Sequence, residues 1–231
     1  MSYIIFKGID SRAVKGLIIS ELPPITKPKM RVRVDTIDGK DGADTVNLGF
    51  EAYTKTVKIG LTRDYDIDNI IAWFNGEGEI QFSNEPDRYY RVKIIDQIDY
   101  TRLLRFKQAD VKFYVQPFKY SVTERTKILD VTGQATAEIR NAGNYFSKPI
   151  IAFTGTGTVN VSVNGRQKCV LNLGAGDSIT TDADRQEAYT GEVLKNRQMD
   201  GDFVTFEVGK NTLTWTGNLT KIEITNYSRW I

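Results

Sequence analysis

The chain has 231 residues, of which 40% are hydrophobic and 26% are charged, a composition typical of a folded globular protein and not of a disordered one. Its 31 basic and 29 acidic residues give a formal net charge of +2, which excludes the strong positive field typical of nucleic-acid-binding proteins. It contains no histidine and one cysteine, Cys169, which excludes Ser-His-Asp and Cys-His catalysis, zinc knuckles and an intramolecular disulfide.

The N-terminal sequence has neither the charged region nor the cleavage site of a signal peptide. No apolar run approaches the ~18 residues that a membrane helix needs. We therefore expect a protein that is made in the cytoplasm and has no membrane anchor. Cys169 lies in a predicted strand, and we interpret it as a small, half-buried apolar residue.

Most segments alternate polar and apolar residues with a period of two, and they are rich in Ile, Val, Thr, Tyr and Phe. This pattern is typical of half-buried strands, so we predict a mainly β protein. In the run 109–116, for example, Phe113 and Val115 share one face while Lys112 and Tyr114 share the other. The clearest predicted strands are 3–6, 30–35, 53–61, 89–95, 104–115, 159–163 and 221–226.

Residues 66–76 break this alternation. Their apolar side chains fall at i, i+3, i+4 and i+7, the spacing of an amphipathic helix: Ile67, Ile70, Ile71 and Phe74. Asp64 or Asp66 can cap the first turn, and Asn75-Gly76 supplies the left-handed residue that ends it. A lone helix of about three turns does not persist in water, so its apolar face must pack on a sheet. The first half is therefore predicted to be an α+β domain with one helix.

The second half has more turn residues and shorter apparent strands, as in 155–167 and 172–186. Such spacing suits a sandwich or a barrel. Asn164-Gly165 is a two-residue type I′ hairpin signal, and a second hairpin is expected at 209–211. We predict an N-terminal α+β domain over residues 1–130 and a C-terminal β-sandwich over residues 131–231.

Carboxylate chemistry is what remains without histidine: a glycosidase pair, or a magnesium or calcium site. The loop 35–44 carries four aspartates, but counting from Asp38 places Lys40 at the third position of an EF-hand, which needs a ligand there. We interpret it as a glycine-rich loop between strands. The acids at 64–68 suit a helix N-terminus, and those at 77–85 suit solvated turns. We therefore predict no catalytic residue, no cofactor and no metal site, and hence no enzyme.

Aromatic residues offer two further interpretations. Exposed tryptophans can form a sugar-binding platform, with Trp73, Trp215 and Trp230 as candidates, but core or interface packing is favoured for the first two. The basic and aromatic run 100–120 has the composition of a single-stranded nucleic-acid site. A long strand with one solvated face is the simpler interpretation, because the overall charge is near zero.

The order of features in the first 120 residues resembles that of one known family. The relevant segments are the opening strands 2–25, the loop 38–42 (DGKDG), 73–76 (WFNG), 78–80 (GEI), 83–90 (SNEPDRYY) and 116–120 (QPFKY). Their order and spacing are similar to those of the N-terminal domain of siphophage distal tail proteins. Each segment is a turn or strand pattern, so the resemblance depends on the whole series.

This resemblance implies a structural protein of a long non-contractile phage tail. It implies an N-terminal domain that forms a homohexameric ring, single or doubled, around the tail channel, and a C-terminal galectin-like sandwich. The ring would join the tail tube to the adsorption apparatus at the tail tip of the virion, after assembly in the host cytoplasm. The implied partners are the major tail tube protein, a hub or fibre protein and receptor-binding proteins, and DNA would pass the lumen without specific binding.

A ring needs an interface that closes on itself, made by strand pairing or by apolar packing between neighbours. We predict that the long segments 53–61 and 89–120 supply it, because they exceed the usual ~5 to 6 residues of a strand. The predicted interface residues are Tyr89, Tyr90, Phe113, Tyr114 and Val115.

Two other functions remain open at this point. One is a carbohydrate-binding module that contacts the host surface with Trp215 or Tyr189 as its platform. The other is a carboxylate glycosidase that acts through the acidic loops.

Overall fold

The computed structural model describes residues 2–231 and confirms a mainly β protein. The chain forms two compact units, one up to Val122 and the other over Thr123–Trp230. The expected division after residue 130 would separate β10 (Lys127–Asp130) from β17 (Gly209–Thr225), with which it pairs along its whole length. Residues 127–130 therefore belong to the second unit.

Unit 1 is built on an antiparallel sheet in the order β2-β1-β7-β8-β9-β6-β3. Its strands are β1 (Ile4–Phe6), β2 (Ile9–Asp10), β3 (Leu17–Glu21), β6 (Tyr53–Leu61), β7 (Glu77–Phe82), β8 (Arg88–Lys93) and β9 (Gln108–Ser121), with a short 3-10 helix at Ser11–Ala13. Alternate residues of these strands face one core, as their period-two pattern predicted. The longest strand, β9, lies between β6 and β8 and joins the two halves of the sheet.

The predicted helix is present as α1 (Ile67–Trp73). The carboxylate of Asp66 caps it by accepting the Asn69 N–H at 3.1 Å, as expected for an aspartate at this position. Ile70 and Trp73 are buried against the sheet, whereas Ile71 is 40% exposed. The apolar stripe is thus narrower than the sequence spacing suggested. Trp73 packs edge-on against Phe6, with ring centroids 6.0 Å apart.

A second helix, α2 (Tyr100–Phe106), contradicts the prediction of one helix in this domain. It replaces the first part of the predicted strand 104–115, which begins only at Gln108 as β9. The Asp99 carboxylate caps α2 by accepting the Arg102 N–H at 2.8 Å, and Leu103 is its buried anchor. Lys107, at φ 59°, ends it in the left-handed conformation. One buried residue in two turns gives too little periodicity to reveal this helix in the sequence.

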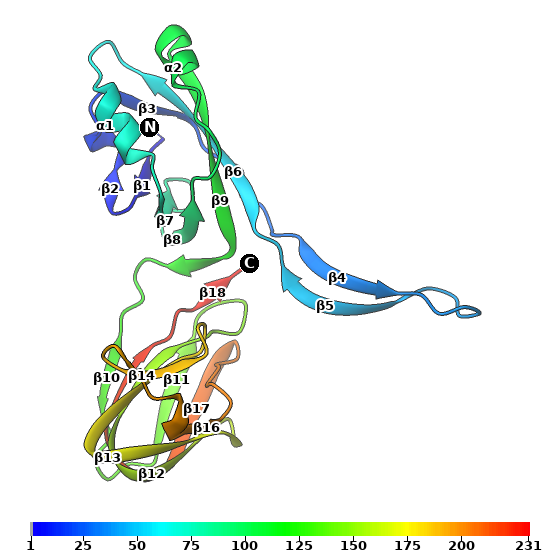
Figure 1. Cartoon of the computed structure of the whole chain (residues 1–231), viewed down its shortest axis with the longest axis vertical. Coiled ribbons are helices and arrows are strands. Elements are labelled where there is room, and N and C mark those ends of the chain that lie inside the picture. The colour runs from blue at the N-terminus through cyan, green and yellow to red at the C-terminus, as the bar shows by residue number, and fades with distance from the viewer. Residues whose placement is uncertain (1) are drawn as a thin grey trace. The chain divides into compact units, whose positions relative to one another are not determined.

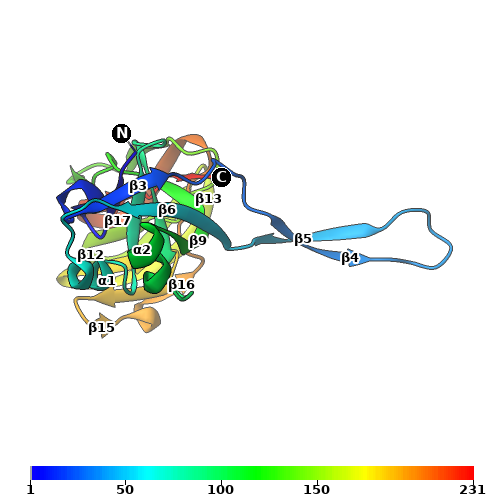
Figure 2. The ribbon, with the colours of Figure 1, turned by 90° about the horizontal axis from the view of Figure 1, so that it is seen from above.

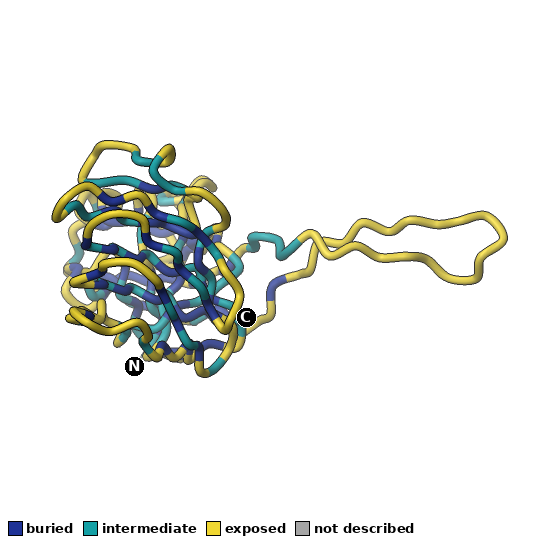
Figure 3. The backbone as a smooth tube through the Cα atoms, turned by 90° about the horizontal axis from the view of Figure 1, so that it is seen from below, coloured by how far each residue is buried: buried dark blue, intermediate teal, exposed yellow. Residues whose placement is uncertain are grey.

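The strands β4 (Met30–Asp35) and β5 (Asp44–Phe50) form a separate two-stranded antiparallel sheet. Figures 1 and 2 show them as a ribbon that leaves the sheet of unit 1 and ends in the loop 36–43. We call residues 29–51 the arm. Every residue from 29 to 48 is exposed (Figure 3). The aspartate-rich loop is thus confirmed as a glycine-containing connection between strands.

Unit 2 is one eight-stranded antiparallel sheet, in which β10-β17-β12-β13-β14-β15 are neighbours and β11 and β16 pair with β17 and β13. Its remaining elements are β11 (Thr136–Asn141), β12 (Ile150–Val163), β13 (Arg166–Asp182), β14 (Glu187–Thr190), β15 (Val193–Leu194), β16 (Met199–Gly201), a 3-10 helix at Asn196–Gln198 and β18 (Arg229–Trp230). The three longest strands carry register shifts, near Gly155 for example. Such bulges bend strands, so the sheet curls around one core in the region where a β-sandwich was predicted.

The hairpin predicted at Asn164-Gly165 is confirmed, because both residues have positive φ and they connect β12 directly to β13. The second predicted hairpin, at 209–211, is wrong. Those residues begin β17 and pair with the end of β11, Lys210 opposite Arg140. Gly209 has a positive φ of 90°, but there it opens a strand and makes no tight turn.

Candidate association surface

The predicted interface residues on β9 divide between the core and the outer face of unit 1. Phe113 and Val115 are fully buried in the core, whereas Tyr114, between them, is 38% exposed. At Tyr114 both edges of β9 are already paired, with Thr54 of β6 and Lys93 of β8. A strand that is paired on both sides cannot accept a neighbour's strand. Here β9 can contribute to association only through outward-facing side chains such as Tyr114.

Tyr89 and Tyr90 are divided in the same way on β8. Tyr90 is buried, and its hydroxyl donates to the carboxylate of Glu85, which also accepts the Lys119 ammonium at 2.6 Å. Burial and the Glu85 charge raise the pKa of Tyr90. Tyr89 faces the other way and stacks on Tyr120, with ring centroids 5.4 Å apart. Of the five predicted interface residues, Phe113, Val115 and Tyr90 are therefore core residues, and only Tyr114 and Tyr89 face outward.

The arm presents exposed aliphatic side chains on both of its faces. Residues directly opposite each other in antiparallel strands share a face, and the register places Val34 opposite Thr45 and Arg33 opposite Val46. Since successive residues alternate between faces, Val32 lies with Val34 on one face, and Leu48 lies with Val46 on the other. Neither face packs on the core of unit 1. The arm is thus the largest run of exposed apolar residues in unit 1.

The charges of the arm are largely paired along its own length. Arg33 bonds to Asp35 at 3.1 Å, and Lys40 bonds to Asp44 at 2.6 Å. Lys29 lies 3.6 Å from Glu51 at the base. Such exposed pairs contribute little to stability, but the opposite charges offset each other locally on the surface that a partner would meet. The arm is therefore suited to apolar contact along its strands.

The segment that leads into the arm is held by two side chains of unit 1, one on β6 and one in the turn between β7 and β8. The Lys55 ammonium donates to the Pro24 carbonyl at 2.7 Å, and the Asn84 amide donates to the Pro23 carbonyl at 3.0 Å. Burial lowers the pKa of Lys55, against the opposing effect of Glu85. Its ammonium also lies 5.2 to 5.8 Å from three aromatic ring centroids: Tyr53, Phe82 and Tyr90. These contacts fix the point from which the arm leaves the sheet.

The sequence pattern predicts β4 correctly but does not reveal the arm as an open surface. The alternation of Val32 and Val34 with arginines is typical of a half-buried strand. The signal for the arm is the matching alternation of Val46 and Leu48, which lie in the partner strand β5. Each strand of this hairpin is apolar on one face, the two apolar faces are opposite each other, and neither packs on the core of unit 1.

The carboxyl groups and the cysteine were the remaining candidates for catalytic groups. Two carboxyl groups have shifted pKa values, and both shift downward: the Arg12 guanidinium lowers the pKa of Asp10, and hydrogen bonds from Thr132 lower that of Asp130. A general acid at neutral pH needs the opposite shift. Burial raises the pKa of Cys169 to about 12, so its thiol is unreactive. No cluster of three metal-binding side chains occurs in residues 2–231, and no helix in that range is long and apolar enough to cross a membrane.

Trp215 cannot serve in the predicted sugar-binding platform. Trp215 is 4% exposed and belongs to the core of unit 2, as Trp73 does to the core of unit 1. A buried indole cannot stack on a sugar, so the preference for core packing is confirmed for both. Tyr189 on β14 and Trp230 on β18 are half-buried.

Comparison with known proteins shows a similarity of fold. No protein-family model matches the chain, and no curated protein matches its sequence. Among solved structures it is similar to the SPP1 Dit (gp 19.1) protein, described as a paradigm of the hub adsorption apparatus in phages that infect Gram-positive bacteria. The TM-score is 0.71 at 17% identity, over 98% of this chain and 99% of that chain.

A second likeness is to the phage P2 baseplate, solved in its activated conformation with Ca, with a TM-score of 0.49, 10% identity and 96% coverage of both chains. The similarity to SPP1 Dit establishes the fold. The chain has the fold of a phage distal tail protein, as the order of its sequence features predicted. In particular, it shares the fold of SPP1 Dit along almost the whole length of both chains.

Proposed function

We propose that this chain is a structural protein of a long non-contractile phage tail, which forms a homohexameric ring, single or doubled, at the distal tail tip. In this role the ring joins the tail tube to the adsorption apparatus. The shared fold with a hub protein supports the proposal. The single observation that carries it for this chain is the arm, because its exposed aliphatic side chains require a partner.

A two-stranded ribbon alone is at best marginally stable in water. The arm nevertheless pairs from Asp35–Asp44 to Met30–Phe50, with one register shift between Met30 and Val32, and its apolar side chains lie on both faces. Covering both faces takes two surfaces, one on each side of the ribbon. A closed ring supplies them when the arm of one copy lies against its neighbours, since a heterologous contact that closes on itself repeats the same interface at every subunit.

The proposed partners follow from this role. They are other copies of the chain, the major tail tube protein on one side, and a hub or fibre protein and receptor-binding proteins on the other. The chain acts in the tail tip of the virion after assembly in the host cytoplasm. DNA passes the lumen without specific binding, for which a net charge of +2 is suitable because it attracts phosphate only weakly.

A role without catalysis is part of the proposal. It is supported by the absence of histidine and by the direction of the two shifted carboxyl pKa values. A carbohydrate-binding role is the weaker alternative, because Trp215 is buried and only Tyr189 of its two predicted platform residues reaches the surface.

Sedimentation velocity of the purified chain over a wide range of concentrations tests the proposal. We expect a shift from monomer to a single closed species as the concentration rises, with no unlimited series of larger ones. A chain that remains monomeric throughout and binds defined glycans on an array would overturn the ring and support the alternative.

A further inference from the structure

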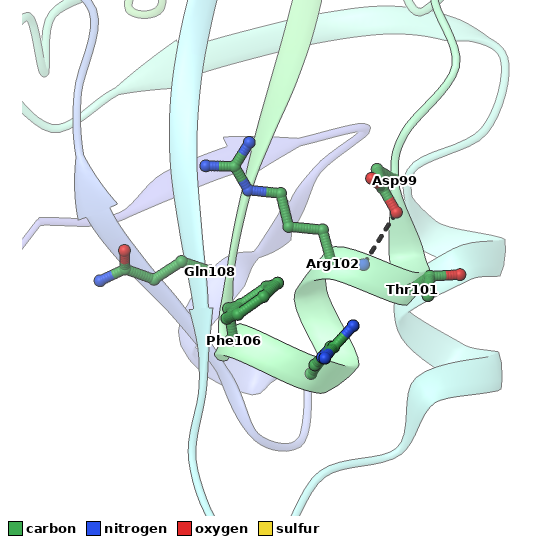
Figure 4. Close-up of a pocket in the computed structure, with 6 residues that line it drawn as sticks. Asp99, Thr101, Arg102, Phe106 and Gln108 are labelled. Atoms are coloured by element: carbon green, nitrogen blue, oxygen red, sulfur yellow. Dashed lines mark hydrogen bonds between the residues drawn. The ribbon is translucent and has the colours of Figure 1, made fainter.

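A pocket of about 460 Å³ lies beside α2, lined by Asp99, Thr101, Arg102, Arg105, Phe106 and Gln108 (Figure 4). Phe106 is 65% exposed, an unusual position for a phenylalanine. Arg102 and Phe106 are four residues apart and therefore lie on one side of the helix. The helix presents an aromatic ring and a guanidinium together at its surface.

The two arginine side chains of this pocket are available to bind a partner. Neither Arg102 nor Arg105 has an ion-pair partner in the part of the chain that the structure describes. The Arg105 guanidinium lies 5.4 Å from the Phe106 ring centroid, and the Asp99 carboxylate is occupied as the helix cap. The pocket therefore offers two free positive charges around an exposed ring, which suits a segment that carries carboxylates next to an aliphatic side chain.

The tip of the arm is such a segment. Ile37 is 55% exposed, and Asp38 and Asp41 form no ion pair with any residue from 2 to 231, whereas Lys40 is held by Asp44. The loop has glycines at 39 and 42, both with positive φ and with open space around them. Two free carboxylates beside one exposed aliphatic side chain thus match two free guanidinium groups beside one exposed ring.

We propose that the tip of the arm of one copy docks into the α2 pocket of another copy, with Asp38 and Asp41 facing Arg102 and Arg105 and with Ile37 against Phe106. The inference rests on the proposed self-association and names its contact. The contact joins two copies because in unit 1 the tip and α2 point in different directions and lie well apart (Figures 1 and 2). A contact of this kind repeats around a ring, since each copy carries one tip and one pocket.

Charge exchange tests the contact. One variant carries Asp38→Lys and Asp41→Lys, a second carries Arg102→Glu and Arg105→Glu, and a third carries all four changes. All these positions are exposed in the monomer, so folding should be retained, which far-ultraviolet circular dichroism and thermal unfolding check. Self-association is measured by sedimentation for each. Arg166→Glu and Arg197→Glu, exposed in unit 2, make a matched control for the reversal of two arginine charges.

Each two-residue variant places like charges opposite each other, so the concentration for half-assembly should rise about tenfold or more. The four-residue variant reverses both partners and should regain most of this loss, and the control should differ little from the unchanged chain. Mixing the two defective variants gives one further readout: each supplies a complementary tip or pocket to the other, so the mixture should assemble where its components do not.

The outcomes separate this inference from the proposed function. If the unchanged chain assembles and both two-residue variants assemble equally well, the docking of tip and pocket is wrong, while the ring remains. If the variants are defective but the four-residue variant and the mixture are no better, the residues matter but do not face each other, which also overturns the inference. If the unchanged chain never assembles at any concentration, the self-association itself fails.

Discussion

Replacing Val32, Val34, Val46 and Leu48 together by threonine removes the apolar character of the arm and keeps residues that favour strands. These side chains are 46%, 55%, 42% and 50% exposed in the single chain. Fully burying one such side chain contributes about 1.5 to 3 kcal/mol relative to leaving it exposed, so covering the exposed half contributes roughly 0.7 to 1.5 kcal/mol. For four side chains the sum is about 3 to 6 kcal/mol per arm.

Part of this sum is offset by the ordering of side chains at an interface. We therefore expect association to weaken about 100- to 1,000-fold, at about 1.4 kcal/mol per tenfold change. Unfolding of the monomer should be almost unaffected, because none of the four residues belongs to the core of unit 1. Sedimentation velocity measures the first quantity, and urea unfolding at a concentration where the chain is monomeric measures the second.

A matched control comes from unit 2, where four aliphatic residues are exposed to a similar or greater extent. They are Ile128, Val193, Leu194 and Val208. Replacing these four by threonine should leave the assembly unchanged. Equal weakening in both variants, or unchanged association in the arm variant, would refute the argument that the arm is the contact.

Three further predictions concern the units themselves, each checked by urea unfolding. Lys55→Met, which removes the buried ammonium that bonds to the Pro24 carbonyl, should cost about 1 to 3 kcal/mol, against less than about 1 kcal/mol for the exposed Lys58→Met. Gly155→Ala, whose new methyl would clash with the backbone of β17, should cost about 2 to 4 kcal/mol, whereas Gly174→Ala in ordinary contact should change stability by about 0.5 kcal/mol or less. Burial raises the pKa of Cys169 to about 12, so the thiol stays protonated in the folded chain. The free energy of unfolding should therefore fall as the pH rises above about 9, where the thiol of the unfolded chain ionises. Cys169→Ala should make this fall shallower.

The strand pattern could be predicted from the sequence because it depends on local alternation. The boundaries predicted for residues 30–35 and 53–61 are those of β4 and β6. The cap of α1 at Asp66 and the turn at Asn164-Gly165 were also predictable, because both depend on the chemistry of one or two residues. What failed was α2, whose single buried residue gives no periodic signal, and whose flanking basic residues resemble the solvated face of a strand.

The association surface was less predictable, because alternation shows that a strand has two faces and does not show what covers either of them. For β9 the alternation was interpreted correctly, yet Phe113 and Val115 were assigned to an interface when they belong to the core. For the arm the same alternation was interpreted as half-buried, when both faces are open. The difference lies in the tertiary neighbours of each strand, which the sequence pattern of the strand itself does not contain.

Imaging of the purified chain by negative-stain electron microscopy, with its mass measured by light scattering on the same sample, tests whether the chain closes into a ring. We expect round particles with a central hole and a mass of about 157 kDa for six copies of 26.1 kDa, or twice that mass for a doubled ring. Particles without a hole and a mass of one chain at every concentration would contradict it.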